Sequence, residues 1–393
     1  MQKIRHFDAF AGCGWFSQAL REAIGESNIE IVWFSEIDKF AIQTYQKNFP
    51  NVRNYGDIEK INIAALPNFD LLTWGFPCQD VSVAGKQDLS KGRTILVEYL
   101  LQILETKKPE YFIFENVKGL MSKKFEDFRN SIYMRIWEAW YNLRAEILNS
   151  KDYGVPQNRE RVFMIGRKVP YTWVLLYPEP IELTKTLADI LEKEPDPKHR
   201  LSWKTYERLK KYESNARVYS SEGISPALNT MQWGHRQPKI LQEYGYSEKA
   251  TKYMYRNSEK YSNWKTRIDI YGNHPEKVCR TITANFRKWA PYNNVIIQIP
   301  RGKNKGGIHK TTSPTVTKNL FVYNNPVSEM GILRKLTPIE CERLQGFPDN
   351  YTQGVSDSQR YKQLGNAVNV KNTKEVIRAL LSNNPKYRWN HSS

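Results

Sequence analysis

Residues 4–24, IRHFDAFAGCGWFSQALREAI, decide the fold class that we predict for this chain. The stretch begins with a mostly apolar run, typical of a buried strand, and ends with apolar side chains at the spacing of a helix face. Between them lie Gly12 and Gly14, which allow a tight turn and a close approach of the backbone to a ligand. The stretch therefore predicts a strand, a glycine turn and a helix, with both glycines as candidate cofactor-binding residues.

The same alternation continues along the first 175 residues. Strand-like runs recur at 29–36, 69–77, 110–116 and 160–166, and helix-like stretches lie at 38–49 and 95–109. This order predicts an α/β fold with a mostly parallel sheet, helices on both faces and ligands at the carboxyl ends of the strands. Residues 178–330 are rich in Pro, Asn, Gly and Ser, which predicts a smaller, loop-rich region with short strands. A closing helix is expected at 371–383.

The charge of the chain is strongly positive and uneven. Its 393 residues carry 59 Lys and Arg against 41 Asp and Glu, a formal net charge of +18. Residues 201–330 alone hold 22 Lys and Arg against 9 Asp and Glu, interleaved with Tyr and Trp. This composition is typical of a surface that binds a polyanion such as nucleic acid, although a solvated basic surface has the same composition.

Composition also excludes several classes of protein. The longest uninterrupted apolar run that we find, 173–177, has five residues, whereas a membrane helix needs about twenty. The first ten residues, MQKIRHFDAF, lack the apolar segment of a secretion signal, so we expect a cytoplasmic protein. The four cysteines form no CxxC pair, which argues against a zinc cluster or a disulfide framework, and no metal site is predicted.

Two acidic residues follow successive strands and are candidates for binding a cofactor. Glu36 ends the 29–36 run, about twenty residues after the glycine turn, where a carboxylate can bind ribose hydroxyls. Asp57 follows a short third strand. Because Ser17 stands where the full dinucleotide motif has Gly or Ala, the pattern favours a nucleoside cofactor over a dinucleotide.

A cysteine and a glutamate at two further strand ends are candidates for catalysis. Cys78 lies in the segment WGFPCQDVS (74–82), between a strand and a helix, where the pKa of a thiol can fall and the thiolate fraction rise. Glu115 follows an apolar strand, where partial burial raises the pKa of a carboxyl group and suits it to donating a proton. The alternatives are a buried structural cysteine and a helix-capping glutamate.

Eight segments, in order, resemble the motif series of the DNA cytosine-5 methyltransferases. They are DAFAGCG, FSEID, GDI, GFPCQ, FENVKGL, DYGVPQNRERVFMIG, TPIECERLQGFP and QLGNAV. The resemblance covers roughly residues 1–168 and 333–380. It implies a Rossmann-like, S-adenosylmethionine-dependent methyltransferase of restriction-modification type, which transfers a methyl group to C5 of a cytosine in double-stranded DNA.

The resemblance also implies a mechanism for named residues. Cys78 would attack C6 of a flipped-out cytosine, while Glu115 would protonate or hydrogen-bond N3. Arg161 would bind the O2 side of the base, and Arg159, which is also a candidate catalytic residue, would brace the site. A loop at roughly 80–95 would close over the base.

The cofactor contacts that the resemblance implies extend beyond the glycine turn. They are Phe16, Glu36, Ile37, Asp57, Ile58, Pro77, Leu96, Asn366 and Ala367. One departure concerns Trp15, which stands where the family usually has a second glycine and changes the expected fit around the methionine part of the cofactor. The segment 121–148 departs most from the family, and no role is predicted for it.

The resemblance divides the chain into two domains. A catalytic domain would span 1–175 and be completed by 350–393, and a target-recognition domain would span 176–349. Lys and Arg there would mostly contact phosphates, and Thr281-Ile282 or Thr315-Val316 would lie near the flipped base, unless both are ordinary strand positions.

The predicted partner is therefore double-stranded DNA, bound by a monomer of prokaryotic or phage origin, with any cognate restriction endonuclease acting separately. Two other functions remain open. One is a tRNA cytosine-5 methyltransferase, which the large basic region disfavours. The other is a catalytically silent DNA-binding protein, which the intact Cys78, Glu115 and Arg161 disfavour.

Overall fold

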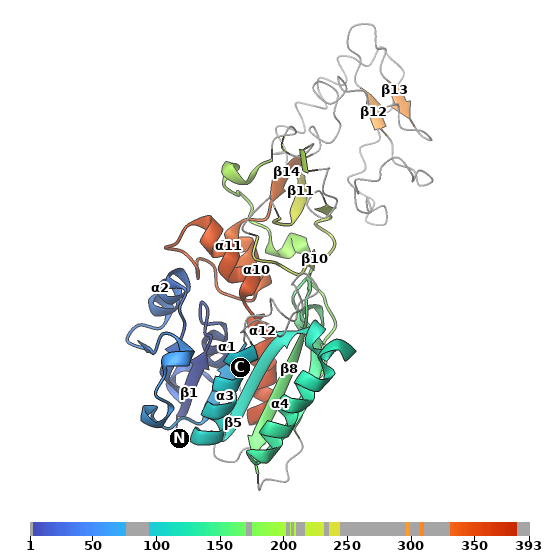
Figure 1. Ribbon diagram of the computed structural model, residues 1–393. Coiled ribbons are helices and arrows are strands. Elements are labelled where there is room, and N and C mark those ends of the chain that lie inside the picture. The colour runs from blue at the N-terminus through green and yellow to red at the C-terminus, as the bar shows by residue number, and fades with distance from the viewer. Residues whose placement is uncertain are drawn as a thin grey trace. The chain divides into compact units, whose positions relative to one another are not determined.

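The structure of the chain is a computed structural model (Figure 1). It describes residues 3–75, 94–169, 175–201, 205, 208–209, 217–231, 236–243, 296–298, 307–309 and 331–382. The chain forms two compact units. The first consists of Met1–Glu192, Ser225–Arg236 and Pro338–Ser393, and the second of Lys193–Ile224 and Gln237–Thr337. Residues 225–236 and 338–349 thus group with the first unit, while the functional domain boundaries stay a prediction.

A seven-stranded sheet in the order β3-β2-β1-β4-β5-β8-β6 forms the centre of the first unit. Its strands are β1 (Ile4–Ala9), β2 (Ile29–Ser35), β3 (Arg53–Asn54), β4 (Leu71–Trp74), β5 (Tyr111–Val117), β6 (Tyr141–Asn149) and β8 (Glu160–Lys168). Neighbours from β3 through β5 are parallel, and β8 runs antiparallel to both β5 and β6. The predicted α/β class with a mostly parallel sheet is confirmed.

Helices cover both faces of this sheet (Figure 1). The helices of the first unit are α1 (Trp15–Ile24), α2 (Lys39–Asn48), α3 (Thr94–Lys107), α4 (Glu126–Glu138), α10 (Pro338–Leu344), α11 (Asp357–Asn366) and α12 (Val370–Leu381). The last of these confirms the predicted closing helix. It packs against α1, and Lys371 forms an ion pair with Glu22 at 2.8 Å.

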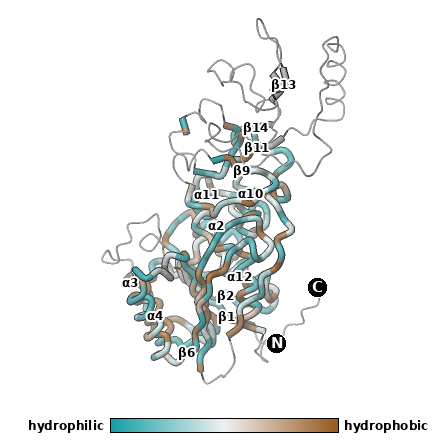
Figure 2. The backbone as a smooth tube through the Cα atoms, turned by 90° about the vertical axis from the view of Figure 1, so that its right-hand side faces the viewer, coloured by the Kyte–Doolittle hydropathy of each residue, from teal (hydrophilic) through white to brown (hydrophobic). Residues whose placement is uncertain are grey.

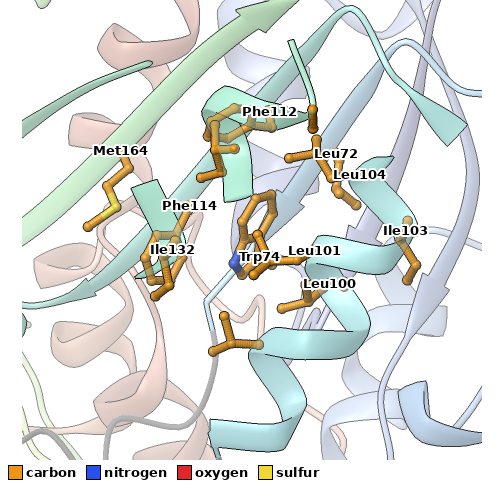
Figure 3. Close-up of a cluster of buried hydrophobic side chains, with 14 of the residues drawn as sticks. Leu72, Trp74, Leu100, Leu101, Ile103, Leu104, Phe112, Phe114, Ile132 and Met164 are labelled. Carbon is orange, nitrogen blue, oxygen red and sulfur yellow. The ribbon is translucent and has the colours of Figure 1, made fainter. Parts of the chain in front are cut away.

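A cluster of buried hydrophobic side chains lies between β4, β5 and the helices α3 and α4 (Figure 3). The indole of Trp74 stacks on Phe114 with 5.4 Å between ring centroids, and leucines of α3 surround it. In Figure 2, brown hydrophobic stretches lie along β1 and β2, whereas α3 and α4 carry brown and teal segments in turn, as helices with one buried face should. This packing fixes the carboxyl ends of β4 and β5, from which the candidate catalytic residues follow.

The segment 121–148, for which the sequence predicted no role, forms α4 and the edge strand β6. Strand β6 pairs along its whole length with β8, so the segment completes the sheet. Its exposed apolar side chains include Met134, Trp137 and Trp140.

The described strands of the second unit are short, as predicted. A three-stranded sheet in the order β14-β11-β9 joins β14 (Gly331–Lys335), β11 (Lys239–Glu243) and β9 (Val218–Tyr219). A separate antiparallel pair consists of β12 (Ile296–Gln298) and β13 (Gly307–His309). The segments that contain Thr281-Ile282 and Thr315-Val316 lie outside the described residues.

Candidate active site

Glu115 lies near the end of β5, directly beside the point where the chain leaves β4. The register pairs Trp74 with Phe114, so Gly75 and Glu115 are the next residues on two adjacent parallel strands. A Cβ atom added to Gly75 would lie 3.2 Å from Glu115 Oε2. The absence of a side chain at position 75 therefore lets the chain pass close to the carboxyl group. Cys78 follows three residues later, and both it and Pro77 lie outside the described residues.

The Glu115 carboxyl group is buried and paired with an arginine. Glu115 is 7% exposed, and its Oε1 lies 3.2 Å from Nε of Arg161 on β8. Burial raises the pKa of Glu115, although the positive charges of Arg161 and Arg159 act in the opposite direction. A raised pKa favours the protonated carboxyl group, which is the form that can donate a proton.

Arg159 is fully enclosed and binds main-chain carbonyl groups. It is 1% exposed, and its guanidinium donates hydrogen bonds to the oxygens of Leu228, Gly365 and Ala367. The same contact region includes β7 (Gln157–Asn158), which pairs with β10 (Ser225–Pro226). One guanidinium thus ties the 225–231 segment to the end of α11.

The glycine turn and the residues predicted to bind the cofactor form a second cluster, at the ends of β1 and β2. Gly12 and Gly14 both have left-handed backbones, with φ of 54° and 93°. The Gly12 N–H donates to Glu36 Oε2 at 2.8 Å, and the other oxygen of Glu36 accepts from the N–H groups of Ile37 and Asp38. Glu36 is only partly buried, so its carboxylate can still accept hydrogen bonds from a ligand.

The turn that carries Asp57 is held beside Glu36 by contacts that sequence analysis missed. The Asn54 side chain accepts from the Glu36 N–H at 3.1 Å and donates to the Glu36 carbonyl at 3.0 Å. Ser35 Oγ donates to the Gly56 carbonyl at 2.7 Å. Asn54 and Ser35 were not singled out because polar residues at strand ends carry no distinctive sequence signal. The two acidic turns predicted from sequence are therefore brought together.

The remaining predicted cofactor residues differ in accessibility. The side chain of Ile37 is 73% exposed next to Glu36, and Asn366 is exposed at the end of α11. Three others have buried side chains, so that any ligand contact would fall to their main-chain atoms: Phe16, Ile58 and Ala367. Leu96 is partly buried against the core.

A buried polar network lies beneath the glycine turn. Asp8 on β1 accepts hydrogen bonds from Ser17 Oγ at 2.8 Å and from Thr73 Oγ1 at 3.0 Å, and Thr73 contacts His6 Nε2 at 2.7 Å. Burial raises the pKa of Asp8 to about 7 and lowers that of His6 to about 3. The network joins β1, β4 and α1 at the strand ends.

Comparison with known proteins identifies the family. The pattern of the C-5 cytosine-specific DNA methylases matches residues 4–382. The chain belongs to this family. It is therefore a DNA (cytosine-5-)-methyltransferase, and its methyl donor is S-adenosylmethionine, the cofactor of the family.

Named relatives of this methyltransferase come from bacteria and phages. The type II methyltransferase M.NlaX of Neisseria lactamica is 31% identical over 95% of this chain and 93% of its own length. The orphan methyltransferase M.SPBetaI of Bacillus phage SPbeta is 29% identical over 97% of this chain and 98% of its own length.

Two solved structures share the fold of this methyltransferase. Methyltransferase EhMeth of Entamoeba histolytica has a TM-score of 0.64 at 17% identity, covering 97% of this chain and 99% of its own. A DNMT2 mutant of Spodoptera frugiperda has a TM-score of 0.64 at 20% identity, covering 96% of this chain and 100% of its own.

The glycine turn has features that fit S-adenosylmethionine. Glu36 and Asp57 offer carboxylates for hydroxyl groups, and the exposed Ile37 offers an apolar surface for a base. Within the described part of the chain, no group of three or more His, Cys, Asp or Glu side chains could hold a metal ion. No helix among the described residues is long and apolar enough to cross a membrane.

Proposed function

We propose that this methyltransferase modifies a flipped-out cytosine at specific sequences in double-stranded DNA, through a covalent bond between Cys78 and C6 of the base. The observation that carries the proposal is the buried Glu115 carboxyl group, which is paired with Arg161 and lies beside Gly75, three residues before Cys78. The proton donor and the cation thus lie on the neighbouring strands β5 and β8, and the nucleophile follows β4, the other neighbour of β5, in the sequence.

In the proposed reaction, the Cys78 thiolate bonds to C6 and pushes electrons through C5 towards N3. Glu115 supplies a proton or hydrogen bond at N3, for which its raised pKa is suited. S-adenosylmethionine supplies the methyl group that C5 takes. A base then removes the C5 proton, the returning electron pair expels the Cys78 thiolate, and a proton given to N3 returns to Glu115, which restores the enzyme.

Arg161 and Arg159 have separate parts in this proposal. Arg161 is paired with Glu115, its side chain is 18% exposed, and it would bind O2 of the cytosine through its planar guanidinium. Arg159 would act through the main chain that it holds, since its guanidinium binds three carbonyl groups. Because C5 and C6 are stacked inside a duplex, the base must be flipped out, at a cost of a few kcal/mol.

The second unit would bind the DNA. Its range includes most of residues 201–330, a stretch that contains 22 Lys and Arg but only 9 Asp and Glu. Such side chains bind phosphates and position a protein on DNA, while a few side chains in the major groove read the bases. The predicted loop at 80–95 and most of this basic range lie outside the described residues.

The proposal also includes a biological setting. The relatives include a type II enzyme and an orphan phage enzyme, which supports a restriction-modification or phage-type system. In either setting the chain would act as a monomer in the cytoplasm, and any cognate endonuclease would be a separate protein.

The mechanism is tested with duplex DNA that contains 5-fluorocytosine in the target site. With S-adenosylmethionine, the wild-type chain should form an adduct that survives denaturation, because fluorine cannot leave C5 as the proton does. Cys78→Ser should form none, whereas Cys279→Ser, which alters a thiol outside the motifs, should match the wild type. An adduct of undiminished yield with Cys78→Ser would refute the mechanism.

The substrate is tested with a methyl-labelled cofactor. Label should appear on C5 of cytosine in duplex DNA, and bisulfite sequencing of a host that expresses the protein should map the target site. A catalytically silent binding protein would retain DNA without labelling it. In a competition between duplex DNA and tRNA, preferential labelling of tRNA would overturn the choice of substrate.

A further inference from the structure

The turn after β2 carries a second carboxylate, Asp38, which has no part in the mechanism proposed above. Its neighbours Glu36 and Ile37 are predicted to contact the cofactor. Asp38 Oδ1 accepts hydrogen bonds from the N–H groups of Phe40 and Ala41 at 2.9 and 3.3 Å, so it caps the first turn of α2. The main-chain N–H of Asp38 donates to Glu36 Oε1 at 2.8 Å. Asp38 therefore joins the start of α2 to the carboxylate of Glu36.

The other oxygen of Asp38 forms an ion pair with a lysine that lies 324 residues further along the chain. Lys362 Nζ, on α11, is 2.6 Å from Asp38 Oδ2. The two side chains are 30% and 27% exposed, so water and salt screen the pair only in part. Burial acts to raise the pKa of Asp38, but the hydrogen bonds from Lys362 and from the α2 main chain outweigh it and lower the pKa. The carboxylate therefore stays charged and paired at neutral pH.

The body of α2 is also held by the C-terminal part of the chain, but through main-chain acceptors. For example, Lys47 Nζ donates to the Asn350 carbonyl at 2.8 Å. The contact of Lys362 differs from this one because it reaches Asp38, the residue whose N–H binds the Glu36 carboxylate. The ion pair thus fixes the turn that carries Glu36, in addition to the helix that follows it.

We propose that Lys362 is a positioning residue for S-adenosylmethionine, which fixes through Asp38 the direction of the Glu36 carboxylate that receives the cofactor ribose. This carboxylate accepts N–H groups of Gly12 and Asp38 on its two oxygens, so its orientation depends on both groups staying in place. An acceptor that is already oriented binds its ligand more tightly, because less freedom is lost on binding. The inference rests on the predicted role of Glu36 and not on the covalent step at Cys78, so each can fail without the other.

Calorimetry with S-adenosylhomocysteine on the full chain measures the effect. Lys362→Met keeps an unbranched apolar stem and removes the charge, so the affinity should fall by about five-fold, the upper end for a partly exposed ion pair. Lys362→Arg keeps the charge and should bind nearly as tightly as the wild type. Wild-type affinity in Lys362→Met would overturn the proposal, and so would an equal loss in both variants.

The matched control is Lys371→Met. Lys371 on α12 forms an ion pair with Glu22 of α1 at 2.8 Å, so this change removes the same charge from another link between the C-terminal helices and the first residues of the chain. The affinity for S-adenosylhomocysteine should equal that of the wild type. A loss as large as that in Lys362→Met would overturn the proposal, because the effect would then not depend on the turn at Glu36.

A double-mutant cycle with Glu36 separates positioning from a general effect on the fold. Glu36→Ala removes the carboxylate that Lys362 is proposed to orient, so adding Lys362→Met to it should cause no further loss of affinity. A structural role predicts the same loss with and without Glu36, and that result would overturn the proposal. If Glu36→Ala alone binds as tightly as the wild type, the inference fails together with the ribose assignment. Poor folding of a variant would lower the calorimetric stoichiometry and not the affinity of the folded chains.

Discussion

Glu36 and Glu115 follow two strands of one sheet, yet their surroundings differ. Glu36 is partly exposed, and its oxygens accept hydrogen bonds from the main-chain N–H groups of Gly12, Ile37 and Asp38. Glu115 is 7% exposed, is paired with Arg161, and has a pKa raised by burial. The first environment suits a carboxylate that binds a ligand, and the second suits an acid that delivers a proton. The same residue type is thus suited to two different chemical roles, because its exposure to solvent differs between the two positions.

The strongest test of this difference removes the acid at Glu115. Glu115→Gln keeps the shape of the side chain but cannot deliver a proton, so the rate of methyl transfer should fall by about 10²–10⁴. Single-turnover transfer from labelled S-adenosylmethionine to duplex DNA measures this rate. Binding of S-adenosylhomocysteine should remain at the wild-type level, and a normal rate in the variant would show that Glu115 is not the proton donor.

The complementary change at Glu36 should affect binding and spare chemistry. Glu36→Ala removes the ribose acceptor and leaves the Gly12 N–H without its partner, so we expect the cofactor affinity to fall by about 10–100-fold. Calorimetry with S-adenosylhomocysteine measures the loss. The single-turnover rate at saturating cofactor should change little. A large fall in that rate would mean that the two glutamates do not divide their tasks as proposed.

Asp8 and His6 extend the comparison to fully buried groups. The folded pKa of Asp8 is raised from 3.8 to about 7, so its contribution to stability is present below pH 3.8 and is lost as the pH rises to about 7. The folded pKa of His6 is lowered from 6.5 to about 3, so its contribution is present above pH 6.5 and is lost as the pH falls to about 3. The two trends oppose each other over nearly the same range.

Single substitutions should therefore separate the two pH dependences of the unfolding free energy, which oppose each other in the wild type. In Asp8→Asn, the free energy of unfolding should rise with pH between about 3 and 6.5, as His6 dictates. In His6→Gln, it should fall between about 4 and 7, as Asp8 dictates. Each change should be on the order of a few kcal/mol. Urea unfolding across this pH range measures it, and parallel curves for the wild type and both variants would contradict the pKa values.

The smallest effect per residue is expected in the basic range 201–330. DNA affinity should fall by roughly 0.9 log units per tenfold rise in salt for each phosphate neutralised. Replacing one Lys of this range by Gln should reduce the salt slope by about one phosphate and leave S-adenosylhomocysteine binding unchanged. Fluorescence anisotropy with labelled duplex DNA over a salt series provides the slope. If a variant lost cofactor binding, the replaced Lys would not belong to the DNA-binding surface of the protein.

Most of the strands that sequence analysis predicted lie inside the sheet, and the short third strand, β3, lies at its edge. β4, β5 and β8 contain near-continuous apolar runs because both of their faces are covered. Strand β6, YNLRAEILN, was missed because it lies at the edge of the sheet and only its ends are buried. A strand with mixed polarity is hard to distinguish from a loop without its partner.

The residues of the candidate site also divide into those that the sequence predicts and those that it does not. Glu36 and Glu115 were predictable because a carboxylate at the end of an apolar strand is a local pattern. The partners of Arg159 were not, because Leu228 and Gly365 are 69 and 206 residues away and contribute carbonyl oxygens that every residue has. The side chain of Asn54, which joins the two acidic turns, was also unremarkable in sequence.

The packing of α1 on α12 has a consequence for synthesis of the protein. The first helix ends at Ile24, and the helix that covers it begins at Val370. A ribosome must therefore translate almost the whole chain before α1 meets its partner. Until Val370–Leu381 has been made, the side of α1 that packs on α12 lacks this partner on the nascent polypeptide.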